Sequence, residues 1–256
     1  MSESKGKFVW YELMTSDMKA AASFYENVIG WDAKDAGMGG PPYTILSVGA
    51  TMVGGLMAIP EDAVAMGAKP IWVGYIGVDD VDAYTARVAA AGGAVYRPPA
   101  DIPTVGRFSV VADPHGATFV LFTGSGPTPA DVSPSAPGHI GWHELHAGDV
   151  ESAFAFYSGL FGWTKGDAVD MGPMGVYQMF ATGGAPVGGM VTKMPQTPAP
   201  FWLYYINVDA VDAVVERATK AGAKVVVPPH EVPGGLWIVQ FLDPQGAMFA
   251  IVAPQR

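Results

Sequence analysis

Two long stretches of this chain repeat one another, and this internal repeat limits the possible folds more than any other feature. Segment 15–31, TSDMKAAASFYENVIGW, matches segment 147–163, AGDVESAFAFYSGLFGW, so that Asp17 recurs as Asp149. Segment 78–103, VDDVDAYTARVAAAGGAVYRPPADIP, likewise matches segment 208–233, VDAVDAVVERATKAGAKVVVPPHEVP. Matches that span nearly both halves indicate a duplication. We therefore predict two tandem domains, 1–123 and 139–256, joined by a linker at 124–138 that is rich in Gly, Pro and Ser.

Each half is predicted to contain two smaller units with the order strand, helix, strands. In the first unit the apolar segment 8–14 predicts a strand, Asp17 predicts a helix N-cap, and Gly30 lies where a helix-ending glycine belongs. The apolar residues between them follow helical spacing. The remaining predicted elements are strands at 43–48, 52–58 and 71–78, a helix from the cap Asp80 to Gly92, and strands near 94–97, 107–113 and 118–122. The pattern predicts four βαβββ-like units in the chain.

Composition and charge exclude several classes of protein. The chain of 256 residues has a formal net charge of −10 and no cysteine. No cluster of Lys and Arg is present, so nucleic acid is not an expected partner. The lack of cysteine excludes disulfides and thiolate chemistry. Because the chain shows no signal peptide and no apolar run of the roughly 18 residues that a membrane span needs, we expect a cytoplasmic protein.

The order of these motifs resembles the vicinal-oxygen-chelate superfamily, which includes glyoxalase I, bleomycin-resistance proteins and extradiol dioxygenases. The resemblance rests on the Asp-capped helix ending in FYxxxxGW, the VDxVDA segment and the DPxG turn, all present in both halves. The openings WYEL and WHEL are also similar to the glyoxalase-like group typified by a mycobacterial 27 kDa antigen. The resemblance implies an α+β fold of tandem domains. In each domain, two βαβββ units form a curved, cup-like sheet with helices outside.

Metalloenzymes of this family hold a divalent metal inside the cup, and the resemblance identifies the positions that supply the ligands. In this sequence those positions carry side chains that do not coordinate metals, namely Trp10, Trp142, Val73, Leu203, Val120 and Ala250, with the last position near Gly55–Leu56 and Gly189–Met190. We therefore predict no cofactor and no metal ligand, although a divalent metal is not excluded. Dioxygenase-like metal chemistry is disfavoured.

Acidic and histidine side chains offer the chemistry that remains. Glu12 and Glu144 occupy matching places two residues after Trp10 and Trp142, and strand alternation directs them to the ligand side of the sheet. They are candidate catalytic acid/base residues; the alternative is that they accept hydrogen bonds from backbone, Tyr or Trp donors within the fold. His146 lies on the same strand face as Glu144, where the two could share a metal only if further donors converged.

Aromatic residues at matching places suggest a binding pocket. Tyr75 and Tyr205 have the parity of the ligand positions, and with Trp10 and Trp142 they would line each cup; the alternative is ordinary core packing. The other parity, that of Trp72 and Trp202 among others, is expected to pack against helices. The predicted ligand-binding residues are Trp10, Tyr75, Trp142, His146 and Tyr205.

The sequence leaves three functions open. The first is a metal-independent protein that binds a small organic molecule, such as a metabolite or a drug. The second is a glyoxalase-like lyase acting on a small carbonyl compound, with Glu12 or Glu144 moving the proton. The third is that one half is degenerate and serves assembly. A homodimer is possible on sequence grounds. The residues do not decide whether the units pair within a half or exchange between halves, and the family resemblance implies one cup per half.

Overall fold

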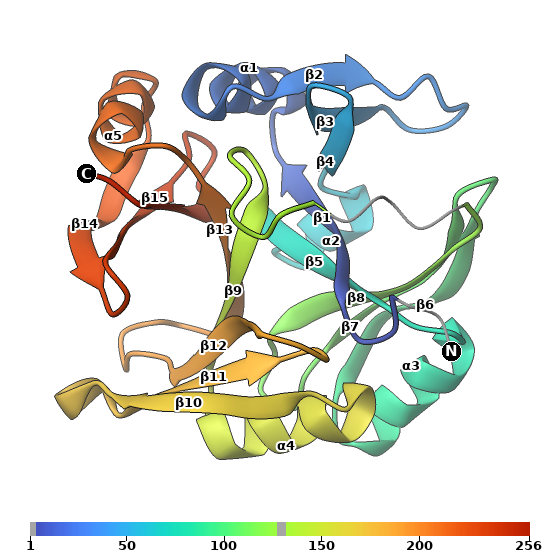
Figure 1. Cartoon of the computed structure of the whole chain (residues 1–256). Coiled ribbons are helices and arrows are strands. Elements are labelled where there is room, and N and C mark those ends of the chain that lie inside the picture. Colours follow the sequence, from blue (N-terminus) through green and yellow to red (C-terminus); the bar gives the residue numbers. More distant parts are fainter. Residues whose placement is uncertain (1–3, 127–131) are drawn as a thin grey trace. The chain divides into compact units, whose positions relative to one another are not determined.

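The computed structural model describes residues 4–126 and 132–256, and the two halves follow the same order of strands and long helices (Figure 1). The first half contains β1 (Phe8–Thr15), α1 (Met18–Ile29), β2 (Asp32–Asp35), β3 (Tyr43–Val48), β4 (Thr51–Ala58), α2 (Glu61–Ala65), β5 (Ile71–Gly77), α3 (Val81–Ala90), β6 (Ala94–Ile102), β7 (Gly106–Ala112) and β8 (Thr118–Gly124). The second contains β9 (Ile140–Ala147), α4 (Val150–Phe161), β10 (Thr164–Asp170), a 3₁₀ turn at Gly172–Met174, β11 (Val176–Ala181), β12 (Pro186–Thr192), β13 (Phe201–Asn207), α5 (Val211–Lys220), β14 (Lys224–Val232), β15 (Leu236–Leu242) and β16 (Met248–Ala253).

The strands form two eight-stranded sheets, and the strand order shows the repeated unit. The orders are β2-β3-β4-β1-β5-β8-β7-β6 and β10-β11-β12-β9-β13-β16-β15-β14. Within each βαβββ unit the first and last strands pair in parallel, as β1 with β4 and β5 with β8, while the hairpins between them are antiparallel. A parallel pair needs a crossover, which the helix after the first strand supplies. The predicted α+β fold of four βαβββ units is therefore confirmed.

The predicted helix boundaries rest on local chemistry that the structure confirms. The carboxylates of Asp17, Asp80 and Asp149 each accept a hydrogen bond from the backbone N–H three residues later, which satisfies a free donor at the helix start. Gly30 ends α1 with φ 87°, a left-handed conformation that glycine adopts without strain. In α5 the capping position is Ala210, and no side chain caps that helix. Within the described residues, no helix combines the length and apolar character that a bilayer crossing requires.

Two proline pairs, Pro98–Pro99 and Pro228–Pro229, interrupt the regular pairing of two edge strands. They lie inside the edge strands β6 and β14. The register between β6 and β7 shifts between Arg97 and Ala100, and the register between β14 and β15 shifts between Val227 and His230. Each shift lets the prolines, which cannot donate a ladder hydrogen bond, pass through a bulge at a sheet edge. The short elements β2, α2 and β10 were absent from the prediction.

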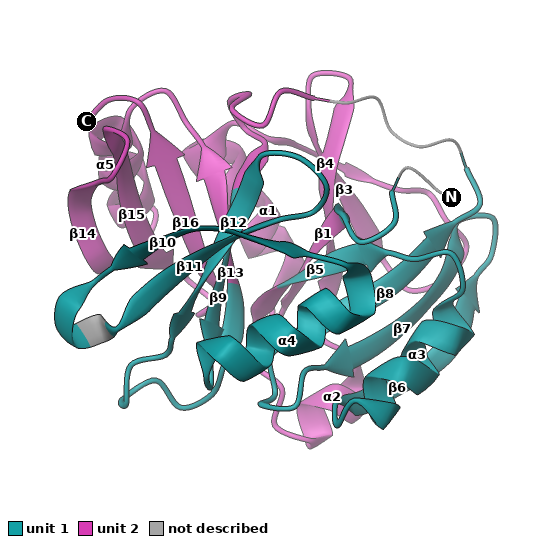
Figure 2. Cartoon of the chain, turned by 60° about the horizontal axis from the view of Figure 1, so that its bottom comes forward, with its two compact units in different colours: residues 1–9, 73–131, 142–202 teal, residues 10–72, 132–141, 203–256 magenta. Residues whose placement is uncertain are grey.

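The chain divides into two compact units, and each unit takes strands and helices from both halves (Figure 2). Unit 1 comprises 1–9, 73–131 and 142–202, and unit 2 comprises 10–72, 132–141 and 203–256. Unit 1 thus contains α3 and α4, whereas unit 2 contains α1 and α5. Each compact unit therefore combines one βαβββ module from the first half with one from the second.

A buried chain of hydrogen bonds links the two modules inside unit 2. Trp72 Nε1 donates to Tyr25 Oη over 2.8 Å, and Tyr25 Oη donates to Asp243 Oδ2 over 3.1 Å. The other oxygen of Asp243 accepts the backbone N–H groups of Gln245 and Ala247, which closes the DPQG turn. The core helix α1 is thereby hydrogen-bonded to a turn that lies far along the chain.

Unit 1 contains the same arrangement with residues from the other two modules. Trp202 Nε1 donates to Tyr157 Oη over 3.1 Å, and Tyr157 Oη donates to Asp113 Oδ2 over 3.3 Å. The expectation that Trp72 and Trp202 pack against helices is confirmed, because their partners lie on α1 and α4. The duplication thus preserves the contact that joins modules as well as the modules themselves.

Candidate ligand-binding sites

The first candidate site lies in unit 2, where Trp10 and Glu12 of β1 meet Tyr43 of β3. Trp10 Nε1 donates a hydrogen bond to Tyr43 Oη over 2.9 Å. The Tyr43 hydroxyl in turn is hydrogen-bonded to Glu12, whose side chain is buried. Burial, followed by the negative charge of Glu12, raises the pKa of Tyr43 far above its usual range, so the phenol stays protonated and donates to the carboxylate.

The second candidate site lies in unit 1 and repeats this arrangement with Trp142, Glu144 and Tyr177. Trp142 Nε1 donates to Tyr177 Oη over 2.7 Å, and Tyr177 Oη donates to Glu144 Oε2 over 3.1 Å. Burial and the nearby Glu144 raise the pKa of Tyr177 in the same way. Each buried carboxylate is thus held by a tyrosine, which agrees with the alternative that the two glutamates accept hydrogen bonds within the fold.

Glycines on the neighbouring strand make room for the two tyrosines. Gly55 pairs with Glu12 and Gly189 pairs with Glu144 in the parallel ladders of β1 with β4 and β9 with β12. A Cβ atom on Gly55 would overlap the Tyr43 hydroxyl, and one on Gly189 would overlap the Tyr177 ring. The ring therefore takes the space that a side chain at this strand position would fill.

The two sites differ where the second half has His146 and the first half has Met14. His146 Nε2 lies 2.8 Å from Glu144 Oε1, and its ring stacks on Phe201 with a centroid distance of 4.4 Å and an interplanar angle of 5°. The residue that matches Phe201 in the first half is Ile71. The histidine, the aromatic ring beneath it and the glutamate thus occur together in one copy.

His143 is not part of this site, because it points to the opposite face of β9. Its ring stacks on Phe8 at 4.1 Å, and its Nδ1 lies 2.7 Å from the carbonyl oxygen of Val187. Burial lowers the pKa of His143 to about 4, and the hydrogen bond to Val187 opposes that shift. The ring is therefore neutral at pH 7 and packs as part of the buried core.

The predicted binding residues Tyr75 and Tyr205 are both buried. The Tyr75 ring packs edge-on against Phe122 at 5.7 Å in unit 1. The Tyr205 hydroxyl accepts a hydrogen bond from Gln240 Nε2 over 2.8 Å in unit 2. These contacts agree with the core-packing alternative, and a role for either tyrosine in ligand binding stays a prediction.

The residues present do not fit a divalent metal. Within the described ranges 4–126 and 132–256, no group of three or more His, Asp or Glu side chains is placed to hold one. The ligand positions inferred from the resemblance carry indole, aliphatic or glycine groups, and the two nearby carboxylates are hydrogen-bonded to Tyr43 and Tyr177. Glu144 and His146 supply two donors, fewer than a protein metal site requires.

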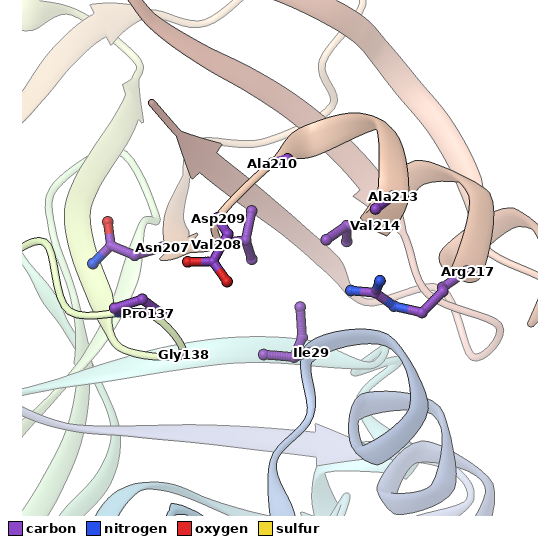
Figure 3. A pocket seen from close by; sticks show the side chains of 10 residues that line it. All are labelled: Ile29, Pro137, Gly138, Asn207, Val208, Asp209, Ala210, Ala213, Val214 and Arg217. Carbon is purple, nitrogen blue, oxygen red and sulfur yellow. The ribbon is translucent and has the colours of Figure 1, made fainter. Parts of the chain in front are cut away.

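A separate groove of about 200 Å³ lies in unit 2 between the end of α1 and the start of α5 (Figure 3). Ile29 and Arg217 flank it, and the Arg217 guanidinium donates to the carbonyl oxygen of Val28 at the C-terminal end of α1. It shares no residue with the Trp10 site. The groove is therefore a product of the helix contact rather than a part of the candidate site.

Sequence reasoning missed the residues Tyr43, Tyr177 and Phe201. A signal for the tyrosines was present, because both precede a Val-Gly-Gly segment, 53–55 and 187–189, at the same spacing. An aromatic residue opposite a glycine pair on an adjacent strand indicates a ring that lies across the sheet.

Comparison with known proteins supports one family for both halves. The sequence model of the glyoxalase/bleomycin resistance protein/dioxygenase superfamily matches residues 7–121 and 137–251. A Mycobacterium bovis protein named "Putative glyoxylase CFP32" is 34% identical over 248 residues, which cover 96% of this chain and 94% of that protein. The "Anthracycline biosynthesis protein DnrV" of Streptomyces peucetius is 34% identical over 263 residues, covering 96% and 93%.

Solved structures of low sequence identity share the fold. The Mn(II)-bound glyoxalase from Novosphingobium aromaticivorans superposes with a TM-score of 0.65 at 17% identity, covering 98% of this chain and 82% of that one. The 2,2',3-trihydroxybiphenyl 1,2-dioxygenase of Sphingomonas wittichii gives a TM-score of 0.63 at 15% identity, covering 96% and 89%. These likenesses concern the arrangement of the chain.

Proposed function

Because the chain belongs to the glyoxalase/bleomycin resistance protein/dioxygenase superfamily, we propose that it binds a small planar organic molecule without a metal. The proposed binding surfaces are the two equivalent sites around Trp10 and Trp142. The observation that carries this proposal is the Trp–Tyr–Glu chain of hydrogen bonds, which occurs in both halves where metalloenzymes of the family place metal ligands.

The ligand class follows from the side chains at each site. Trp10 and Trp142 are half-buried, and their indole nitrogens are already satisfied by the tyrosines. Each indole therefore offers an apolar face at low entropic cost, which favours stacking with a flat ring system. One relative is named for anthracycline biosynthesis, and anthracyclines contain such a ring system, which supports the same class.

The test is a titration of the full chain, purified without chelator, with the planar probe 2-methoxynaphthalene. We expect saturable binding that quenches tryptophan fluorescence and is unchanged by EDTA. Trp10→Ala and Trp142→Ala should each remove one site, because each deletes the stacking surface of one half. The matched control is Trp237→Ala, which removes a tryptophan that lies on β15 outside both sites.

Two results would contradict the proposal. The first is stoichiometric metal in elemental analysis together with binding that disappears in EDTA. The second is probe binding that both Trp10→Ala and Trp142→Ala leave intact. A melting temperature that rises with added Mn²⁺ or Zn²⁺ would also contradict the proposal, because a metal that binds the folded state stabilises it.

A glyoxalase-like lyase is the second candidate, favoured by the buried Glu144 and its hydrogen bond to His146. In that case Glu12 or Glu144 would move the proton of a small carbonyl compound. Turnover of methylglyoxal with glutathione by the wild type, lost in Glu12→Gln or Glu144→Gln, would support it. Turnover at the wild-type rate in both variants would show that neither glutamate moves the proton.

Two predictions about the protein's surroundings remain to be tested. One is a cytoplasmic location, and the other is a homodimer. Light scattering of the full chain during size-exclusion chromatography distinguishes a monomer from a dimer, since the chain mass is 26.8 kDa.

A further inference from the structure

We propose that His146 is a proton acceptor for the hydroxyl group of a ligand, and that this makes the second site selective for planar phenols and enols. The inference rests on the proposed function, because it assumes that small planar molecules reach the Trp142 site. It goes further in assigning different chemistry to the two halves. The first site would bind flat apolar rings, and the second would also take up a ligand proton.

The hydrogen bonds around Glu144 determine which nitrogen of His146 carries the proton. One carboxylate oxygen accepts the Tyr177 hydroxyl, and the other lies 2.8 Å from His146 Nε2. An ionised carboxylate only accepts hydrogen bonds, so Nε2 must carry the hydrogen. The lone pair of a neutral imidazole is then on Nδ1. Glu144 is thus a positioning residue that sets the tautomer.

The Nδ1 atom is the one left for a ligand. No described residue forms a hydrogen bond with it, and the His146 side chain keeps a relative exposure of 16%. The parallel stacking on Phe201 holds the imidazole plane, which fixes the direction of the Nδ1 lone pair. A base with a fixed tautomer and a fixed plane is prepared for proton transfer before the ligand arrives.

The first half keeps the glutamate, as Glu12, but lacks the histidine and the aromatic ring that stacks on it. At the place of His146 it has Met14, whose thioether is a weak acceptor and does not take up a proton. At the place of Phe201 it has Ile71, which cannot stack. Because the rest of the site is retained in both halves, the difference between His146 and Met14 is a natural comparison within one chain.

The proton transfer is balanced without any co-reactant. The O–H bond of the ligand breaks, its electron pair stays on the oxygen, and the proton forms an N–H bond at Nδ1 of His146. The ligand becomes a phenolate or enolate, and the imidazole becomes an imidazolium. The new positive charge lies next to the Glu144 carboxylate, which stabilises it while Nε2–H stays hydrogen-bonded.

The experiment compares 2-naphthol with 2-methoxynaphthalene, two planar probes that differ in the protic hydroxyl. The protein is the full chain with Trp10→Ala, so that the second site is observed. We expect 2-naphthol to bind about 5-fold to 10-fold tighter than the ether, the effect of one additional hydrogen bond. We also expect the ground-state absorption band of naphtholate from the bound probe, and the ¹⁵N signal of Nδ1 to move from an unprotonated toward a protonated position.

Matched variants separate His146 from the rest of the site. His146→Met copies the residue of the first half and should equalise the two affinities and abolish the ground-state naphtholate absorption band, while ether binding is retained. Met14→Ala should leave the preference unchanged. Glu144→Gln should alter the Nδ1 signal, because an amide can donate to or accept from Nε2 and no longer selects one tautomer.

The outcomes distinguish this inference from the proposed function. If both probes bind equally and His146→Met changes neither affinity, the proposed function stands and His146 is not a proton acceptor. If neither probe binds to either site, the proposed function fails for planar ligands, and this inference fails with it. An Nδ1 signal that is already protonated in the free protein at pH 7.5 would also overturn the inference.

Discussion

The ring of Tyr177 lies across Gly189, in the space that a side chain on that glycine would occupy. Gly189 pairs with Glu144, so the tyrosine lies across the strand position next to the buried carboxylate and donates its hydroxyl proton to it. Tyr43 has the same relationship to Gly55 and Glu12. The absence of two side chains is therefore what allows the two tyrosines to hold the glutamates.

Gly189→Ala tests this relationship directly. The added methyl group must displace the Tyr177 ring, so we expect a loss of about 1–3 kcal/mol in the free energy of unfolding, the usual cost of overpacking. Gly159→Ala is the control, because this exposed glycine of α4 has open space around its Cβ position. It should be neutral or stabilising by up to about 1 kcal/mol. Urea denaturation of both variants gives the comparison, and equal stability would contradict the steric argument.

The buried His143 predicts a dependence of stability on pH. Burial gives His143 a pKa of about 4 in the folded protein, whereas an unburied histidine has a pKa of 6.5. Between these two pH values the unfolded chain therefore binds more protons than the folded chain. Stability is then fully present above pH 6.5 and is lost as the pH falls toward 4. From pH 7 to pH 5 the loss from this group is about 2 kcal/mol.

His143→Gln isolates that contribution, since glutamine does not titrate. The variant should show a smaller loss of unfolding free energy between pH 7 and pH 5 than the wild type in guanidinium titrations. Its other titrating groups are shared with the wild type, so their effects cancel in the difference. An identical pH dependence in both proteins would mean that His143 is accessible to protons in the folded state.

We expect the turn aspartate Asp243 to contribute more to the stability of the fold than a hairpin residue usually does. Its carboxylate accepts the Tyr25 hydroxyl and two backbone N–H groups, while burial raises its pKa. In Asp243→Asn one oxygen becomes an amide nitrogen that cannot accept, which should cost about 1–3 kcal/mol. Asp113→Asn should have a similar effect in unit 1. Thermal denaturation checks both, with Asp209→Asn at an exposed position as the control.

The arginines Arg87 and Arg217 are expected to stabilise helix ends that lie far along the chain. Arg217 donates to Val28 at the end of α1, and Arg87 donates to Gly159 and Leu160 at the end of α4. A cation at a helix C-terminus complements the helix dipole and satisfies free carbonyl groups.

Replacing Arg217 with Gln should therefore speed amide hydrogen exchange at the end of α1 and leave α4 unchanged. Arg87→Gln should show the reverse pattern. Because the effect is partly electrostatic, the difference from wild type should shrink at high salt. Exchange that rises uniformly over both helices in either variant would contradict the local role.

The sequence by itself determined the duplication and the four βαβββ units. These properties depend on local chemistry. An Asp caps a helix through the N–H three residues later, a glycine ends it in the left-handed region, and apolar spacing selects helix or strand. Strand alternation likewise predicted that the side chains on one strand face lie together, namely Trp10 with Glu12 and Trp142 with Glu144 and His146.

Only the tertiary structure decided which residues meet across the chain. It brings Tyr43 and Tyr177 to the two glutamates, pairs α1 with α5 and α3 with α4 inside the compact units, and carries the prolines of β6 and β14 through bulges. The physical reason is that such contacts join segments far apart in the sequence, and a local sequence pattern does not show which distant segments come together. Propensity describes a residue's own backbone, whereas a tyrosine over a glycine depends on the register of two strands.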